Sequence, residues 1–179
     1  FSLVAPRSFS HSRKPSARLL DWKEEEVKEV ALAALLHDVG KLQVPEEILH
    51  KTESLTPMEM RTVQGHAVLG FRLLQEAGVF PLPVLAGVLQ HHERLDGSGY
   101  PLHTKSDKTH VFAKIIAIAD VYDAMTSQKS YGTQHSAFVA LDEIQSSILS
   151  GQLDTHCGQA FLKLMQNHLA GEWLELTDG

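Results

Sequence analysis

Hydrophobic residues recur every three or four positions along most of the chain, the spacing that places them on one face of an α-helix. A first helix is predicted from an N-cap at Asp21 to a stop at Gly40, which puts His37 and Asp38 in its last turn. A short helix is predicted over 45–49. The apolar face of the first helix consists of Val27, Val30, Ala31, Ala34 and Leu35.

A longer helix is predicted over 56–76. Thr56 and Glu59 have the spacing of a capping box at its start, and Gly78 can stop it. His66 lies at or beside its apolar face. That face consists of Met60, Val63, Ala67, Phe71 and Leu74.

The second half of the chain continues the helical period. A helix is predicted to begin at Pro83 and to end just before the glycine-rich stretch 97–101, so it carries His91 and His92. A helix over about 110–129 follows, then one that stops at Gly151 and one that begins after Asp154. Their predicted core positions are Val84, Leu85, Val88, Leu89, Phe112, Ile115, Ile116, Ala119, Tyr122, Phe138, Leu141, Ile144, Ile148, Phe161, Met165 and Leu169. No segment is confidently a strand, so the predicted class is all-α, a packed helical bundle.

Composition limits the class of protein, the partners and the compartment that we expect for this bundle. The chain has 179 residues, 43% of them hydrophobic, which suits one globular domain. The longest apolar run, 111–119, is too short to span a membrane and is broken by Lys114. The net charge of −6 argues against a DNA or RNA duplex as partner. With one cysteine, Cys157, and no targeting motif, we expect a cytoplasmic protein without membrane contact. Because position 1 is Phe, we expect a fragment of a longer protein.

Six residues could together bind metal. They are His37, Asp38, His66, His91, His92 and Asp120. Singly, each has a structural explanation, since a buried histidine is usually a hydrogen-bonded core residue and an aspartate can cap a helix. Together, they would be costly to bury in an apolar bundle unless cations neutralised them.

The number and type of these candidate ligands predict two metal ions. Six nitrogen and oxygen donors exceed one tetrahedral site and suit two octahedral ions that share a carboxylate, for which Asp38 is the candidate. Ligation without sulfur favours Fe(II) or Mn(II), with Zn, Ni or Mg as alternatives. Paired ions of this kind hydrolyse phosphodiesters, and Lys41 is the candidate to assist the leaving oxygen. The alternative for Lys41 is a solvated surface lysine.

Three motifs resemble a known family. His37-Asp38-Val39-Gly40-Lys41 is similar to the HD-x-G-K signature of HD-domain phosphohydrolases. His91-His92-Glu93 with Asp96-Gly97-x-Gly99-Tyr100-Pro101 resembles the mark of the HD-GYP subgroup, and 119–126 is similar to its next block. The resemblance runs from about Trp22 to Leu169. It implies an HD-domain helical bundle with a GYP-containing loop that hydrolyses cyclic di-GMP to linear pGpG, with or without further hydrolysis to GMP.

The resemblance also suggests roles beyond the six ligands. Lys41 and Asp38 are the expected catalytic residues. Gly97 and Gly99 bring backbone close to a ligand or to neighbouring chain. Tyr100 either stacks on a guanine or anchors the loop. The expected substrate-binding residues are Lys41, Gly97, Gly99, Tyr100, Asp123 and Lys129, and Asp123 has a structural role as its alternative.

The chain departs from the family pattern in three places. The upstream metal-binding histidine of the family is matched best by His11, which lies only 26 residues before His37. Arg7 stands where some members have a glutamate for a third metal, which favours two metals here. Lys129 stands where the family has an arginine, and a lysine binds phosphate as a point charge rather than as a fork. A less selective contact with the second phosphate is therefore expected.

Domain boundaries and partners complete the expectations. Residues 21–170 should form the catalytic domain, with a lead-in over 1–20 and a tail over 171–179. Expected partners are cyclic di-GMP, a second copy in a homodimer, and an N-terminal sensory domain or a diguanylate cyclase. The alternatives are a phosphohydrolase for another cyclic dinucleotide, and a weakly active binding module that responds to cyclic di-GMP.

Overall fold

The computed structural model describes residues 22–127 and 135–177, and every regular element in this part of the chain is a helix. The all-α prediction is therefore confirmed. The elements are α2 (Glu24–Leu36), the 3₁₀ helix η1 (Val39–Gln43), α3 (Glu46–Leu49), α4 (Pro57–Gln64), α5 (His66–Ala77), α6 (Leu82–Gln90), the 3₁₀ helix η2 (Ser106–Lys108), α7 (Val111–Thr126), α8 (Ala137–Leu149) and α9 (Thr155–Thr177).

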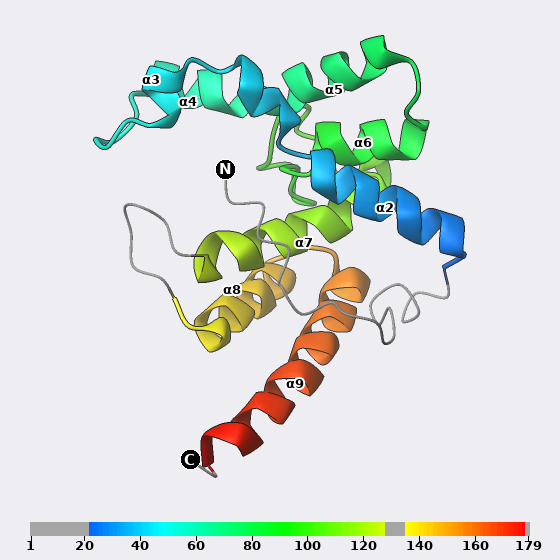
Figure 1. The fold of residues 1–179 in the computed structure, drawn as a ribbon, viewed down its shortest axis with the longest axis vertical. Coiled ribbons are helices and arrows are strands. Elements are labelled where there is room, and N and C mark those ends of the chain that lie inside the picture. The colour runs from blue at the N-terminus through cyan, green and yellow to red at the C-terminus, as the bar shows by residue number, and fades with distance from the viewer. Residues whose placement is uncertain (1–21, 128–134, 178–179) are drawn as a thin grey trace.

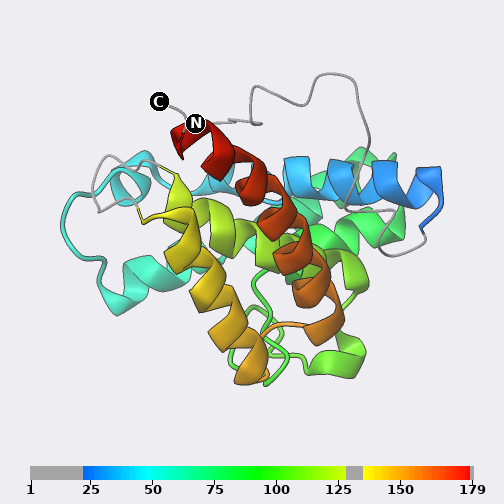
Figure 2. The same ribbon diagram turned by 90° about the horizontal axis from the view of Figure 1, so that it is seen from below.

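The helices form two groups that share α7. Figure 1 shows α2, α5 and α6 grouped above α7, with α8 and α9 below it. Helix α6 packs against α2, α5 and α7, and η1 packs against α5. Seen from below, α8 and α9 cross the near face (Figure 2), and both pack on α7. The segments that carry the candidate site residues therefore meet between α5, α6 and α7.

Helix α7 is buried on two sides. Phe112 and Ile116 pack with the upper helices, in a cluster with Ala33 and Val84. The opposite side supplies buried residues to a lower cluster, made of Ala117, Ile118, Leu141, Ile144, Ile148, Leu153, Cys157 and Leu162. A helix with neighbours on both sides has no single apolar stripe. For this reason the single-face prediction for this helix placed Ala119 in the core, although it is exposed.

One predicted core position on α8 is also wrong. Leu141, Ile144 and Ile148 are buried as expected, but the side chain of Phe138 is 49% exposed. Phe138 lies in the first turn of α8. Helix α9 begins after Asp154, as predicted, and runs to Thr177. The segment predicted as a tail from residue 171 is therefore largely helical, whereas the domain boundaries themselves stay predictions.

The boundaries of the first helix differ from the prediction at both ends. Helix α2 begins at Glu24, where the Glu26 carboxylate accepts the Lys23 backbone N–H at 2.9 Å. It ends at Leu36, before the predicted ligands. Gly40 lies inside η1 instead of stopping α2, and a side chain there would collide with the backbone of α5. Glycine at this position permits close packing of η1 on α5.

Two further boundaries matter for the site. The predicted helix 56–76 is two helices, α4 and α5, with a break at Gly65. Thr56 caps α4 as predicted, accepting from Glu59 N at 3.3 Å, and Gly78 ends α5 with φ +70°. Helix α6 begins at Leu82 and ends at Gln90, so the prediction that it carries the two histidines is wrong. They lie in the turn that follows.

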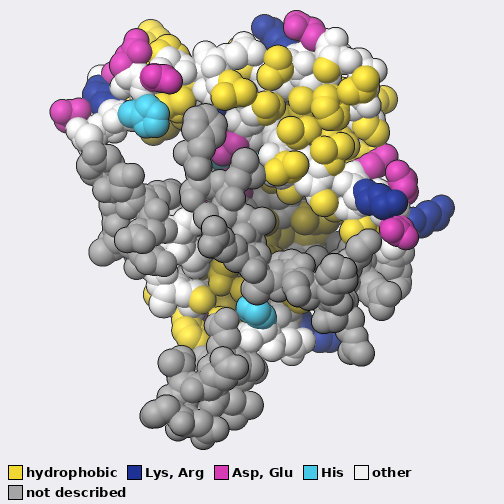
Figure 3. Space-filling model, in the orientation of Figure 1, with side chains coloured by type: hydrophobic (Ala, Val, Ile, Leu, Met, Phe, Trp, Pro, Cys, Tyr) yellow, Lys and Arg dark blue, Asp and Glu magenta, His cyan; other side chains and the backbone are white. Residues whose placement is uncertain are grey.

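The outer surface carries some apolar side chains. Figure 3 shows hydrophobic side chains gathered over α2, α5 and α6 on the face of Figure 1. Exposed large residues of these helices and their connection include Leu35, Val79 and Leu82. Among the described helices, none is both long and apolar enough to cross a bilayer.

The apolar face predicted for the first helix is partly wrong: Leu35, Ala31 and Ala34 are exposed, because α2 packs on α6 through Ala33 instead. Met60 of α4, also predicted on an apolar face, is exposed as well.

Candidate metal centre

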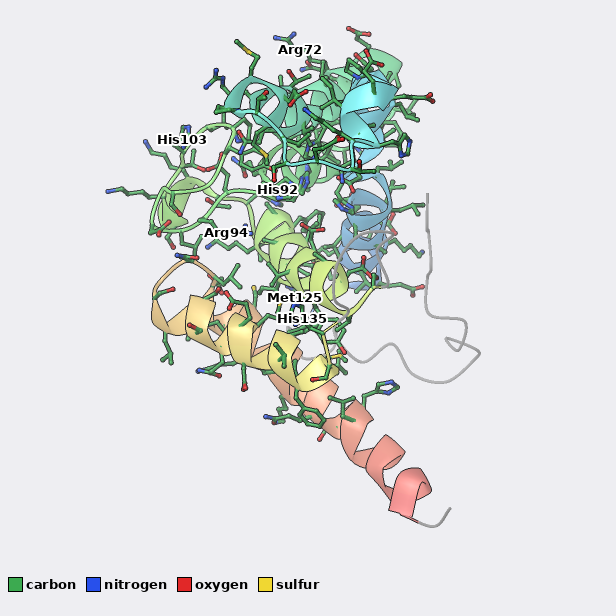
Figure 4. All side chains as sticks on the ribbon, turned by 90° about the vertical axis from the view of Figure 1, so that its left-hand side faces the viewer. Arg72, His92, Arg94, His103, Met125 and His135 are labelled. Atoms are coloured by element: carbon green, nitrogen blue, oxygen red, sulfur yellow. The ribbon has the colours of Figure 1, made fainter. Side chains whose placement is uncertain are left out.

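The structure brings together all six residues predicted to bind metal, which we call the His/Asp cluster. His37 and Asp38 follow α2, His66 is the first residue of α5, and the His91–His92 pair follows α6. Asp120 alone comes from the middle of a helix, α7. Figure 4 shows His92 above the near end of α7, with Arg94 and His103 beside it on the following loop. The cluster forms because helix ends converge on one side of α7.

Three histidines of the cluster are each oriented by the helix that precedes them, namely α2 for His37, α4 for His66 and α6 for His91. The Nδ1 atoms of His37, His66 and His91 each lie 2.7 Å from the backbone carbonyl three residues earlier. A carbonyl only accepts, so Nδ1 carries the proton and the lone pair is on Nε2. Metal-binding histidines are usually held in this way, with the second ring nitrogen bonded to a carbonyl or carboxylate. All three Nε2 atoms are therefore prepared to bind a cation.

The buried centre of the cluster has more acceptors than donors. His66 and His91 are 1% and 0% exposed, and their Nε2 atoms lie 3.2 Å apart with two lone pairs facing each other. Asp38 Oδ1, 3.4 Å from His66 Nε2, is buried and has no hydrogen-bond partner within the described chain. Such an arrangement is unfavourable unless a cation lies between the acceptors. The residues present therefore fit a metal ion.

Four of the six residues form the tighter part of the cluster. One donor atom each from Asp38, His66, His91 and His92 lies within 4.8 Å of the others. Nitrogen and oxygen donors at this spacing can all reach one ion of ordinary divalent size.

The remaining two residues, His37 and Asp120, lie beside this group, next to Asp38 and His92. Nε2 of His37 lies 3.5 Å from Asp38 Oδ2 and 3.8 Å from Asp120 Oδ1. The other oxygen of Asp120 lies 3.8 Å from His92 Nδ1. Asp38 thus turns one oxygen toward His66 and the other toward His37. The predicted role of Asp38 as a bridging carboxylate stays a prediction.

Burial sets the charge of the cluster. It lowers the pKa of His66, His91 and His92, the last to about 4, so these rings are neutral at pH 7. Burial also opposes charge on His37, but Asp120 and Asp38 together raise its pKa. The pKa of Asp120 is lowered because His37 and His92 outweigh the effect of burial. His66, His91 and His92 are therefore neutral and Asp120 is ionised, which are the forms that bind metal.

Lys41 belongs to the site. Its Nζ lies 2.6 Å from Asp38 Oδ2, and its side chain is 39% exposed. Helix η1, which is held close to α5 at Gly40, supplies this geometry. Lys41 is thus both paired with Asp38 and partly solvated, and its catalytic role stays a prediction.

Residues 94–104, which we call the Tyr100 loop, pass beside the cluster. The ring of Tyr100 lies 4.7 Å from the ring of His92, tilted by 30°. Gly97 has φ +87°, a conformation that favours glycine. A side chain on Gly99 would collide with the backbone of residues 92–94. Both glycines thus serve the fold of the loop, and their contact with substrate stays a prediction.

The other candidate substrate residues are less central. Asp123 is exposed and accepts a hydrogen bond from Ser127 Oγ at 2.8 Å, which is a structural role. Its contact with substrate stays a prediction. His11 and Lys129 lie outside the described residues.

Sequence reasoning assigned no role to Glu93, although it lies within the quoted motif. Its side chain is 2% exposed and accepts from the backbone N–H groups of Leu102, at 2.6 Å, and Thr104, at 2.9 Å. The signal for it was its place directly after two histidines predicted to point inward.

Comparisons with known proteins agree with this geometry. A family model described as "HD domain" matches residues 3–156. The chain is 35% identical over 163 residues to cyclic di-GMP phosphodiesterase PA4108 of Pseudomonas aeruginosa, covering 91% of this chain and 39% of that protein. It is 40% identical over 150 residues to a cyclic di-GMP phosphodiesterase of Thermotoga maritima, covering 83% and 40%.

A third relative has a different named substrate. It is the 3'3'-cGAMP-specific phosphodiesterase 1 of Vibrio cholerae, 35% identical over 170 residues, covering 90% of this chain and 38% of that protein. Among solved structures, the HDG"Y"P protein Bd1817 of Bdellovibrio bacteriovorus matches with a TM-score of 0.68 and 19% identity, covering 85% of this chain and 48% of that one. This match shows a shared fold. The chain spans about two fifths of the length of the curated relatives it matches.

Proposed function

The chain belongs to the HD domain family and its motifs resemble the HD-GYP subgroup; from this premise we propose that it is a metal-dependent phosphodiesterase that converts cyclic di-GMP to linear pGpG. The observation that carries the proposal is the buried set of facing acceptors, with His66 and His91 Nε2 atoms 3.2 Å apart beside the unpartnered Asp38 Oδ1. Burial of such a set is favourable only with cations present.

The His/Asp cluster is proposed to hold two divalent ions. Asp38, His66, His91 and His92 would hold one, His37 and Asp120 would hold the other, and Asp38 would contact both. Donors without sulfur favour Fe(II) or Mn(II), and His11 is a further candidate ligand. Such ions, when bound, lower the pKa of a water and neutralise the phosphate in the transition state.

The chain's own residues complete the chemistry. Lys41 Nζ, 2.6 Å from Asp38, carries a positive charge at the mouth of the cluster, where it can contact a phosphate or the leaving oxygen. Tyr100, next to His92, forms an aromatic wall that can stack on a base and exclude water. Lys41 and Tyr100 would therefore position the substrate against the cluster.

The second candidate function is hydrolysis of another cyclic dinucleotide. It is favoured by the relative named 3'3'-cGAMP-specific, which is as similar to this chain as the PA4108 relative is. A weakly active module that binds cyclic di-GMP is less favoured, because the candidate ligand set is complete. A homodimer, a sensory domain and a diguanylate cyclase partner stay predictions.

The decisive experiment is an assay on protein purified without oxygen and loaded with Fe(II) or Mn(II). Cyclic di-GMP, 3'3'-cGAMP and cyclic di-AMP are supplied separately, and products are separated by chromatography. We expect cyclic di-GMP to be hydrolysed fastest, with pGpG appearing before any GMP, and chelator to abolish turnover. Equal rates on all three would refute selectivity, and binding without product would support the module.

A further inference from the structure

Glu93 is a buried carboxylate outside the His/Asp cluster. Its side chain is 2% exposed, and in the described part of the chain no lysine, arginine or histidine pairs with it. The neighbouring Arg94 donates to the Glu93 backbone carbonyl instead, at 3.0 Å. A buried charge is costly unless hydrogen bonds satisfy it. The role of Glu93 therefore lies in the hydrogen bonds that its carboxylate accepts from two backbone N–H groups.

Those two N–H groups belong to the Tyr100 loop. Oε1 accepts from Leu102 N at 2.6 Å, and Oε2 accepts from Thr104 N at 2.9 Å. One side chain thus binds two alternate residues of the loop, one oxygen for each. A carboxylate that accepts from backbone N–H groups makes stronger bonds than a neutral acceptor.

The loop is also held on the other side of Tyr100. The backbone N–H of Tyr100 donates to His92 O at 3.2 Å, and Gly99 packs directly on the backbone of residues 92–94. Tyr100 is therefore bracketed: contacts with residues 92–94 hold it on one side, and the Glu93 carboxylate holds the chain on the other. The result is the 4.7 Å separation between the Tyr100 and His92 rings.

We propose that Glu93 is a positioning residue: its carboxylate holds the Tyr100 loop against the His/Asp cluster and so fixes the aromatic wall of the substrate site. It acts through Tyr100 and does not itself contact metal or substrate. The inference deepens the proposed function, because the wall matters to catalysis only if a base-containing substrate binds there.

Replacement of the charge separates this role from simple packing. In Glu93→Gln the side chain keeps its size but has one acceptor oxygen, and its NH₂ group faces a second donor. We expect KM for cyclic di-GMP to rise about tenfold, the effect of losing one charge-assisted hydrogen bond. Metal content and kcat should stay close to those of the wild type. Glu143→Gln on α8, where the carboxylate accepts from Ser147 Oγ, is the matched control.

A double-mutant cycle tests whether Glu93 acts through Tyr100. Kinetics are measured for Glu93→Gln, Tyr100→Ala and the double variant. If the proposal holds, Glu93→Gln has no further effect on KM once Tyr100 is alanine, because coupled residues are not additive. The proposal would be overturned if Glu93→Gln raised KM equally with Tyr100 and with alanine at that position. It would also be overturned if kcat fell by as large a factor as KM rose. Should Glu93→Gln not fold, Glu93→Asp keeps the charge but shortens the reach, and the same cycle applies.

A readout without turnover keeps this inference separate from the proposed function. Hydrogen exchange is followed in metal-free wild type, Glu93→Gln and Glu143→Gln. The amides of residues 99, 100 and 102–104 should exchange faster only in Glu93→Gln, while those of α8 stay as in the wild type. Unchanged protection of the loop would refute the role of Glu93. If wild type hydrolyses no cyclic dinucleotide, the proposed function fails, and the exchange result still decides the positioning role.

Discussion

The two sides of α7 are built on different principles. Toward α8 and α9, the buried cluster is apolar and includes Ile118, Ile144 and Ile148. Toward α5 and α6, apolar clusters lie beside buried polar side chains, namely His66, His91 and Glu93. The lower side is stabilised by its own packing. The upper side contains groups that are costly to bury without a bound cation.

This difference predicts how each side responds to metal. A ligand that binds only the folded state stabilises it, by about 2.7 kcal/mol at a hundred times Kd. The gain in stability should be concentrated in the elements that supply the cluster, which are the ends of α2, α5 and α6. Helix α8 supplies no cluster residue and should be stable in metal-free protein. Four predictions test this contrast, from the largest effect to the smallest.

The first prediction removes a ligand. His66→Ala should lose bound metal and reduce kcat by at least about 1,000-fold, because the ions supply several kcal/mol of transition-state stabilisation. Elemental analysis and turnover are measured on the same sample. His156→Ala, an exposed histidine of α9, is the control and should retain both. Full metal content in His66→Ala would place the ions elsewhere.

The second prediction breaks the apolar side. Ile144 is fully buried in α8, and Ile144→Ala should destabilise the protein by about 2–5 kcal/mol through lost burial and a cavity. Denaturant unfolding of metal-free protein measures this. The metal affinity of the fraction that remains folded should not change. A parallel loss of metal affinity would mean that the two sides are coupled through α7.

The third prediction concerns Lys41, which contacts the cluster without being a candidate ligand. Lys41→Ala should lower kcat by about 100-fold, the usual cost of removing one electrostatic contact to the transition state. Metal content should be retained, since Asp38 keeps its place between His66 and His37. An unchanged kcat would exclude Lys41 from the mechanism.

The fourth prediction uses pH. The folded-state pKa of His92 is lowered to about 4 from 6.5, chiefly by burial. The unfolded chain therefore binds the proton more readily, and metal-free protein should lose stability as pH falls from about 6.5 toward 4. His92 should account for about 2 kcal/mol of that loss after allowance for partial exposure. Unfolding at pH 7 and pH 4.5 measures it, and His92→Gln should flatten the dependence.

The helices and the ligand types could be read from the sequence because both depend on local features. The apolar period predicted the α-helical segments, although it merged α4 and α5 into one helix, and Thr56 and Gly78 marked the two ends of that pair correctly. The resemblance to the HD-GYP subgroup, carried by three short motifs, is confirmed by the family match and the named relatives. Side-chain chemistry, together with the predicted helices and their ends, selected the six residues of the cluster.

Several of the errors have the same origin. Gly40 was taken for a helix stop, Ala119 and Phe138 for core positions, and Glu93 was given no role. Three of them depend on a neighbour distant in sequence: α5 for Gly40, the packing on both sides of α7 for Ala119, and the Tyr100 loop for Glu93. Local periodicity has no information about such neighbours.

The sequence by itself determined an all-helical chain with imidazoles and carboxylates at helix ends, because capping, periodicity and side-chain chemistry act over a few residues. Only the tertiary structure decided that His66 and His91 face each other at 3.2 Å with Asp38 beside them, and that Glu93 holds the Tyr100 loop. These contacts join segments 25 residues or more apart, or a loop that folds back on its own start. Their geometry follows from how helices pack, which no local pattern specifies.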